Sequence, residues 1–219
     1  MTVLIVSPHG MDEVLGCGGL MAGLAAAGYV VETLVLFGDG TGADAARRLA
    51  GPAAAKELGS QPPRYIGLPE NRSDTVPLLD VVGAIERTIS QTGASEIYVP
   101  HRDHLNIDHQ AAFNAAMIAA RPVPKAPVRS ILTYEILSSS DWAAPSAPGF
   151  QPIRFVDISR DLEKKLKALA HYDADMRPTP HSRSYDGVRA LARHRGLTVG
   201  FEAAEAFGVV RQLVSGIDD

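Results

Sequence analysis

One stretch near the N-terminus decides the fold: SPHGMDEVLGCGG, residues 7–19. It follows the β-branched apolar residues 2–6 (TVLIV), which predict a buried strand, and precedes the Ala- and Leu-rich residues 20–27, which predict a helix. His9 and Asp12 therefore lie where a strand passes into a helix, the edge of an open α/β sheet at which ligands bind. Both side chains can point at one metal ion from there. The alternative is a capping Asp beside a surface His.

The composition bounds the number of domains and the classes of partner. A chain of 219 residues without a shift in composition predicts a single domain spanning residues 1–219. A net charge of -4, with Lys and Arg scattered, argues against nucleic acid or an anionic membrane as partner. We expect no membrane span and no signal peptide, because no apolar run approaches about 20 residues. The single cysteine, Cys17, precludes an internal disulfide and suits a reducing cytoplasm, where we expect the protein.

Strands and helices alternate along the first 120 residues. Strands are expected at 29–37, 64–68 and 96–100, and helices at 43–58, 76–92 and 111–120. This alternation predicts an α/β fold with a Rossmann-like, doubly wound, mostly parallel sheet. Within the second helix, Gly51-Pro52 is expected to cause a break or kink. A C-terminal extension of strands and helices follows, with strands expected at 129–137 and 154–158 and helical stretches at 160–172, 185–195 and 202–213.

A second polar stretch, HRDHLNIDH at residues 101–109, follows the strand expected at 96–100. It holds three of the seven histidines in the chain. A His/Asp/His set drawn from the two polar stretches would provide the three protein ligands of a catalytic zinc site. Zinc polarises carbonyls and lowers the pKa of bound water to about 7, so the implied chemistry is hydrolysis of an acyl bond. The alternative is a solvated loop with an Asp helix cap.

These motifs resemble those of the PIG-L/LmbE-like zinc N-deacetylases. Residues 9–13 (HGMDE), with the glycine turn at 16–19 (GCGG), resemble the family's His-Pro-Asp-Asp-Glu motif and the turn after it. Residues 106–109 (NIDH) resemble its His-Pro-Asp-His motif. Three further stretches look like one bacterial branch of the family: 67–72 (GLPENR), 180–184 (PHSRS) and 204–207 (AEAF). The resemblance covers essentially the whole chain.

The resemblance implies a Rossmann-like fold and three zinc ligands, His9, Asp12 and His109. Another divalent transition metal would also suit such ligands. The implied reaction removes an N-acetyl or other N-acyl group from an amino sugar or sugar conjugate, so the implied partner is a small amino-sugar substrate. The identity of that sugar is open. A homo-oligomer is compatible with the sequence, because members of the family differ in oligomeric state.

Two positions depart from the family pattern. Met11 stands where the family has the Asp usually assigned as general base, and a thioether cannot accept a proton from water. Asn106 replaces a His that helps to stabilise the oxyanion, and an amide can donate that hydrogen bond. A base must then come from elsewhere. We expect Asp108 or His104 in this role, and His181 is a further candidate.

Three basic side chains are expected at the substrate mouth. The resemblance favours Arg72 and His181, and Arg183 lies in the same proline-containing loop as His181. Each is alternatively a surface residue, and Trp142 is either a platform for a sugar ring or a packing anchor. Three functions stay open: a zinc-dependent deacetylase with another base, a catalytically degenerate relative that binds metal or sugar, and a hydrolase of a different amide.

Overall fold

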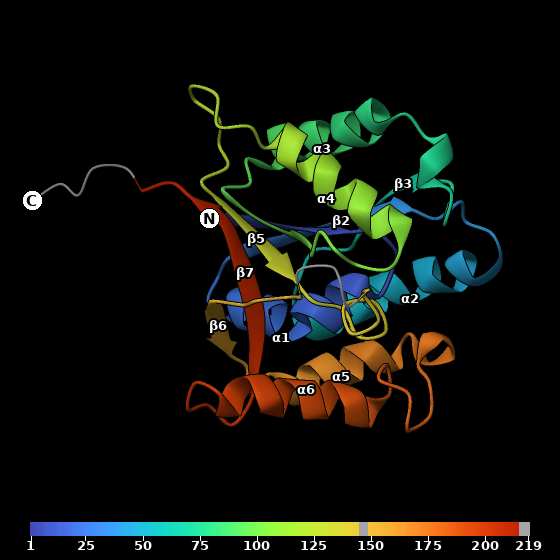
Figure 1. Cartoon of the computed structure of the whole chain (residues 1–219), viewed down its shortest axis with the longest axis vertical. Coiled ribbons are helices and arrows are strands. Elements are labelled where there is room, and N and C mark those ends of the chain that lie inside the picture. Colours follow the sequence, from blue (N-terminus) through green and yellow to red (C-terminus); the bar gives the residue numbers. More distant parts are fainter. Residues whose placement is uncertain (145–148, 215–219) are drawn as a thin grey trace, which may run out of the picture.

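The computed structural model describes residues 1–144 and 149–214, and these form one mostly parallel sheet with helices on both faces (Figure 1). The strands are β1 (Thr2–Ser7), β2 (Val30–Phe37), β3 (Arg64–Leu68), β4 (Glu96–Pro100), β5 (Ser130–Tyr134), β6 (Arg154–Asp157) and β7 (Ala204–Gln212). Their order across the sheet is β3-β2-β1-β4-β5-β7-β6. The first five strands are parallel, and β7 runs antiparallel to both β5 and β6. The expected doubly wound fold is confirmed.

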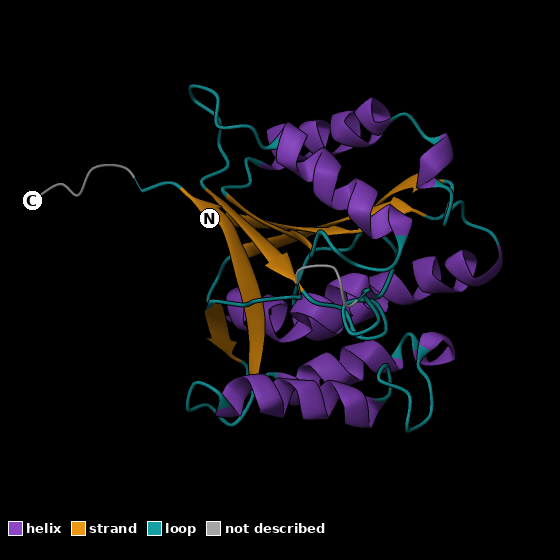
Figure 2. Cartoon of the chain, viewed as in Figure 1, coloured by secondary structure: helices purple, strands orange, loops and turns teal. Residues whose placement is uncertain are grey.

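The helices form two layers around the sheet (Figure 2). They are α1 (Asp12–Ala26), α2 (Gly42–Leu58), α3 (Leu78–Thr92), α4 (Ile107–Ala119), α5 (Leu162–Ala170) and α6 (Tyr185–Leu197), with short 3-10 turns at Ser73–Thr75 and Asp173–Asp175. Alternate residues of β1 face opposite layers: Val3 and Ile5 pack in the core under α1 and α5, whereas Leu4 and Val6 pack under α3 and α4. No helix among the described residues is long and apolar enough to cross a membrane.

The strand order places two turns side by side. From β1 the chain moves to β2 and β3 on one side and then returns to β4 on the other side. The carboxyl ends of β1 and β4 therefore flank the point at which the direction of winding changes, where open α/β sheets bind ligands. The β1–α1 turn carries His9 and Asp12, and the β4–α4 turn carries residues 101–106. The fold thus brings together the two polar stretches singled out in the sequence.

Two local predictions about helices need correction. The expected break at Gly51-Pro52 is wrong, since α2 runs uninterrupted through both residues. A Cβ on Gly51 would lie 2.1 Å from Tyr65 Oη, so close packing against β3 accompanies the continuous helix. Helix α4 begins at Ile107 rather than at 111, because the side chain of Asn106 caps it by accepting a hydrogen bond from the Asp108 N–H at 2.8 Å.

The helix expected at 202–213 is wrong, because these residues contain strand β7. β7 pairs with β5 on one side and β6 on the other, with Phe207 opposite Tyr134. Phe207 is fully buried. The Ala- and Glu-rich start of this segment favours a helix locally, but pairing on both sides satisfies the strand's backbone and buries its aromatic residue.

A buried ion pair from the C-terminal extension binds backbone groups of α1. The Glu205 carboxylate accepts hydrogen bonds from the backbone N–H groups of Gly19 and Leu20 at 2.8 and 2.7 Å. Lys165 Nζ lies 2.7 Å from Glu205 Oε1 and donates to Leu15 O at 2.8 Å. In a regular helix the Gly19 N–H would bond to Leu15 O. The ion pair therefore couples α1, which begins at Asp12, to α5 and β7.

Residues 16–19, expected as a turn, lie within α1, and two of their glycines make this close approach possible. A Cβ on Gly16 would lie 2.2 Å from the Tyr134 ring, and one on Gly19 would lie 2.6 Å from Ile158 Cγ2. Real Cβ contacts are essentially never this short. These two glycines thus allow α1 to lie directly against β5 and the segment after β6.

We expect Glu205→Ala to lower the free energy of unfolding by about 3–5 kcal/mol, because it leaves the buried Lys165 ammonium without its counter-charge. Urea titration measures the loss. The matched control is Glu86→Ala, which breaks an exposed pair with Arg121 and should cost less than about 1 kcal/mol. Equal losses in the two variants would contradict the assigned role, and Glu205→Gln serves if the alanine variant does not fold.

Candidate metal centre

Three buried side chains converge at the carboxyl edge of β1 and β4. Ligating atoms of His9, Asp12 and His109 all lie within 4.8 Å of one another. Asp12 Oδ2 is 3.2 Å from His9 Nδ1 and 3.3 Å from His109 Nε2. Burial disfavours the charged carboxylate, but His109 and His9 outweigh it and hold the pKa of Asp12 well below its usual range. The cluster therefore offers one carboxylate and two imidazoles to a cation.

His9 is held from behind by Asp108. Burial lowers the pKa of His9, but hydrogen bonds to Asp108 and Asp12 outweigh burial and raise it to about 9. His9 Nε2 lies 2.9 Å from Asp108 Oδ2. When Nε2–H donates to Asp108, the lone pair of Nδ1 faces Asp12, as metal ligation requires. A divalent cation would take the place of the second ring proton.

Asp108 is fully buried and also binds the loop after β3. Its carboxylate accepts hydrogen bonds from the backbone N–H of Asn71 at 2.6 Å and of Ser73 at 3.1 Å. These bonds and His9 lower the pKa of Asp108 despite its burial. Both oxygens are therefore used in joining two turns to the loop, and Asp108 does not line the cavity described below.

His109 is held by a second relay of hydrogen bonds. His109 Nδ1 lies 2.9 Å from His104 Nδ1, and His104 Nε2 lies 2.7 Å from Ser140 Oγ. If His109 Nε2 is to present a lone pair, its Nδ1–H must donate to His104, and His104 Nε2–H must then donate to Ser140. Burial and the neighbouring His109 lower the pKa of His104, which keeps it in the neutral form that this relay needs.

A cavity of about 220 Å³ opens beside the cluster. Its lining comes from the β1–α1 turn, α2, the loop after β3, the start of α4, the loop after β5 and the loop before α6. The described lining residues are His9, Gly10, Met11, Asp12, Arg47, Glu70, Asn71, Asn106, His109, Ile136, Leu137, Ser138, Ser139, Trp142 and Arg183. An open polar hollow beside convergent ligands can hold a small polar substrate.

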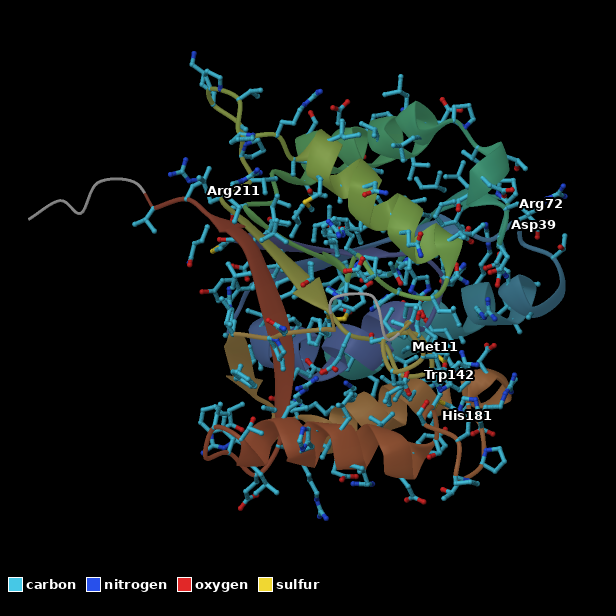
Figure 3. All side chains as sticks on the ribbon, viewed as in Figure 1. Met11, Asp39, Arg72, Trp142, His181 and Arg211 are labelled. Atoms are coloured by element: carbon cyan, nitrogen blue, oxygen red, sulfur yellow. The ribbon has the colours of Figure 1, made fainter. Side chains whose placement is uncertain are left out.

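The residues expected at the mouth separate into two groups. Arg183 lines the cavity, whereas Arg72 and His181 do not. Figure 3 shows Arg72 away from Met11, while Trp142 and His181 lie near each other with their ring centroids 5.2 Å apart. Trp142 itself lines the cavity and is half exposed. His181 thus contacts the wall of the cavity rather than its interior.

Of the three expected catalytic residues, only Asn106 reaches the cavity. Its side-chain amide donates to Asn71 Oδ1 at 2.8 Å, so this nitrogen already has a protein partner. Asp108 and His104 lie behind His9 and His109, and their contacts suit orientation of those rings better than proton transfer to water. The assignment of a base among them stays a prediction.

Sequence reasoning missed several lining residues, above all Arg47. This arginine of α2 pairs with Glu70 at 2.8 Å and with Asp175 at 2.9 Å. The three residues come from separate parts of the chain, and only Glu70 lies in a stretch noticed in the sequence, 67–72. An Arg in an Ala-rich helix is ordinarily a solvated surface residue, so only the packing of α2 against the sheet edge reveals it.

Met11 combines an unusual backbone with a position in the cavity wall. Its φ is +89°, in the region that L-residues other than glycine rarely adopt, and it precedes the first residue of α1. Only 2% of the residue is exposed, and its side chain belongs to the core under α1. A non-glycine residue with positive φ beside a site points to a functional constraint on that turn.

Comparison with known proteins gives consistent relatives. Residues 4–120 match the family described as PIG-L, GlcNAc-PI de-N-acetylase. A protein of Escherichia coli (strain K12) named uncharacterized deacetylase YaiS is 28% identical over 175 residues. That match covers 76% of this chain and 88% of the relative.

Solved structures show the same fold. The N,N'-diacetylchitobiose deacetylase of Pyrococcus horikoshii has a TM-score of 0.77 at 19% identity, over 96% of this chain and 84% of that chain. The 4-carboxy-2-hydroxymuconate hydratase GalB of Pseudomonas putida KT2440 has a TM-score of 0.78 at 18% identity, over 100% of this chain and 99% of that chain. A deacetylase and a hydratase thus share this architecture, which by itself does not select a reaction.

Glu13, next to the cluster, carries a carboxyl group buried away from the cavity. Burial raises the pKa of Glu13 to about 7, against stabilising hydrogen bonds from Tyr172 and Ser7. Ser7 Oγ lies 2.6 Å from His9 O and 3.0 Å from Glu13 Oε2. The single hydroxyl hydrogen of Ser7 can be donated either to His9 O or to Glu13 Oε2. When it is donated to His9 O, Ser7 Oγ can accept a hydrogen bond from a protonated Glu13.

We therefore expect Glu13→Gln to gain stability over wild type as pH rises, when both proteins have been treated with a chelator. Between pH 4.5 and 7 the folded state keeps the Glu13 proton that the unfolded state has lost. The free energy of unfolding of wild type therefore falls as pH rises through this range. The difference in unfolding free energy between variant and wild type should shift by about 3 kcal/mol in favour of Gln between pH 4 and 8. Urea titrations at several pH values measure it, and a pH-independent difference would refute the assignment.

Proposed function

The chain belongs to the PIG-L family of deacetylases, and from this premise we propose that it is a metal-dependent hydrolase of N-acylated amino sugars or their conjugates. The observation that carries the proposal is the buried cluster of His9, Asp12 and His109 beside a polar cavity of about 220 Å³. Metal-dependent hydrolysis of an N-acetyl or other N-acyl group needs a ligated cation next to a space for the sugar, and this arrangement fits both needs.

We propose zinc as the metal, held by these three residues. Two imidazoles and one carboxylate are ligands that zinc accepts in catalytic sites, and other divalent transition metals accept them too. Asp108 behind His9 and His104 behind His109 supply the outer hydrogen bonds that orient such ligands. A bound zinc ion would polarise the acyl carbonyl and acidify a water molecule.

The chain's own residues then divide the remaining work. Asp108 and His104 fix the rings of the ligands, and Asn106, which lines the cavity, faces the substrate. Among the described lining residues, Glu70 is the one carboxylate that does not belong to the metal cluster. It therefore joins Asp108 and His104 as a candidate base. Arg183 and the exposed ring of Trp142 are the proposed substrate contacts within the cavity, with Arg72 and His181 as predictions outside it.

One observation favours a second candidate function. With Met11 in the cavity wall, position 11 offers no group that accepts a proton. A protein that binds metal and sugar without hydrolysis would have the same cluster and cavity. Acetate release from a panel of N-acetylated amino sugars by the zinc-loaded protein separates the two candidates.

The metal assignment predicts that His109→Ala loses tightly bound zinc. Removing one of three protein ligands should reduce zinc to well below one equivalent after dialysis, measured by elemental analysis. The control is His194→Ala, an exposed histidine of α6, which should retain the wild-type content. A full equivalent of zinc in the His109 variant would show that the ligands are misassigned.

Because position 11 lacks a base, we expect Met11→Asp to gain turnover. General-base assistance contributes about 10²–10⁴-fold, so a carboxylate at this position should raise kcat and shift the pH–rate profile. Met11→Asn is the matched control, because Asn also tolerates positive φ but accepts no proton at neutral pH. Equal rates in the Asp and Asn variants would mean that position 11 does not reach the reacting water.

A further inference from the structure

A row of three side chains leads away from the metal cluster: His109, His104 and Ser140. The Nδ1 atoms of the two rings are 2.9 Å apart, and His104 Nε2 is 2.7 Å from Ser140 Oγ. Both rings are buried, and burial together with the neighbouring His109 and His101 lowers the pKa of His104, which keeps this ring neutral. A neutral imidazole has one N–H and one lone pair, so the role of one ring nitrogen decides the role of the other. The order of donors along the row is therefore set at its metal end.

One order of donors applies to protein from which metal has been removed by a chelator. His109 Nε2 faces Asp12 Oδ2 at 3.3 Å, and an ionised carboxylate can only accept a hydrogen bond. Nε2 must therefore carry the hydrogen of a neutral His109, and Nδ1 accepts from the Nδ1–H of His104. His104 is then left with a lone pair on Nε2. The hydroxyl of Ser140 donates to this lone pair, so Ser140 is the donor at the far end of the row.

Binding of a cation to His109 reverses this order. Ligation uses the lone pair of Nε2, so the hydrogen of His109 lies on Nδ1 and is donated to His104 Nδ1. His104 must then carry its own hydrogen on Nε2 and donate it to Ser140 Oγ. One proton leaves His109 Nε2 for water, and one proton returns from water to the Ser140 hydroxyl. The three side chains therefore hold the same number of protons in both orders, and only the tautomers of the two rings differ.

Ser140 is the member of the row that can serve both orders. A hydroxyl has one hydrogen and two lone pairs. Ser140 Oγ accepts from the backbone N–H of Ile136 at 2.8 Å, which leaves one lone pair and the hydrogen for His104. The backbone N–H of Ser140 donates to Ile136 O at 2.9 Å, so the residue is fixed within the loop after β5. Its hydroxyl is thus held within hydrogen-bond distance of His104, whichever of the two groups donates.

We propose that Ser140 is a positioning residue that acts on His109 through His104: it donates to His104 in the metal-free protein and accepts from His104 when His109 binds a cation. The inference rests on the proposed function, because it concerns the proposed metal centre. In the metal-bound order the buried His104 N–H depends on Ser140 as its acceptor, and a buried N–H without an acceptor is costly. Outer partners of metal-ligating histidines contribute about 10- to 100-fold in metal affinity. Ser140 thus stabilises the tautomer of His109 that binds metal.

NMR of the wild-type protein with nitrogen-15-labelled histidines tests the change of tautomer. The spectra are recorded at pH 8, where an imidazole with the ordinary pKa of about 6.5 is neutral. We expect His104 to carry its hydrogen on Nδ1 after chelation and on Nε2 after addition of one equivalent of zinc. Long-range couplings between the ring nitrogens and the ring hydrogens distinguish the two tautomers. His194, an exposed histidine of α6, is the internal control and should give the same signals in both samples.

Substitution of Ser140 tests its contribution to metal binding. Competition with a chelator of known affinity should show that Ser140→Ala binds zinc about 10- to 100-fold more weakly than wild type. Ser140→Thr keeps the hydroxyl and should restore most of this affinity. The matched control is Ser60→Ala, which removes a half-buried hydroxyl that donates to Ala55 O at 3.3 Å and should leave the zinc affinity unchanged. If Ser140→Ala does not fold, the wild-type spectra decide, because they require no variant.

The outcomes separate this inference from the proposed function. A single His104 tautomer in both samples, in protein that binds one equivalent of zinc, would overturn the inference and leave the proposed function intact. Full zinc affinity in a folded Ser140→Ala variant would overturn it as well. A change of tautomer with zinc, without acetate release from any N-acetylated amino sugar, would support the inference and refute the proposed hydrolysis. Wild-type protein that binds no divalent transition metal, as measured by elemental analysis, would refute both.

Discussion

The carboxylate of Asp108 is the interaction on which the site depends. It receives hydrogen bonds from His9 and from the backbone of Asn71 and Ser73, and so joins the β1–α1 turn, the start of α4 and the loop after β3. A fully buried carboxylate is stable only when such donors surround it. Because His9 Nε2 bonds to Asp108, Nδ1 is the ring nitrogen that faces Asp12. The buried Asp108 carboxylate thus holds three segments that are distant in sequence in a fixed arrangement.

The C-terminal extension completes what the parallel sheet begins. Glu205 and Lys165 bind backbone groups of α1, so the helix that begins with Asp12 is fixed by residues about 150 and 190 positions away. The extension also provides Arg183 from the loop before α6. The extension thereby adds a charged side chain to the wall of the cavity at the ends of β1 and β4.

Met11 shows how local chemistry can change on a retained scaffold. Met11 has a positive φ and a buried position, and it carries a thioether where the resemblance implies a carboxylate. Nothing in the packing requires a proton acceptor there, because Met11 simply contributes to the core under α1. Fold and chemistry can therefore vary separately at this position, as the shared architecture of a deacetylase and a hydratase also indicates.

The sequence by itself determined the strand-to-helix turns and the parallel sheet, because both follow from local periodicity. It also determined the convergence of His9, Asp12 and His109, because the carboxyl ends of parallel strands meet at one edge of the sheet. Only the tertiary structure decided that residues 204–212 form a strand, because the pairing partners that stabilise it lie at least 47 residues away in sequence. It likewise placed Arg183 in the cavity and Arg72 outside it, and Asp108 behind His9. Side-chain direction and desolvation arise from packing between distant segments, and no local pattern records them.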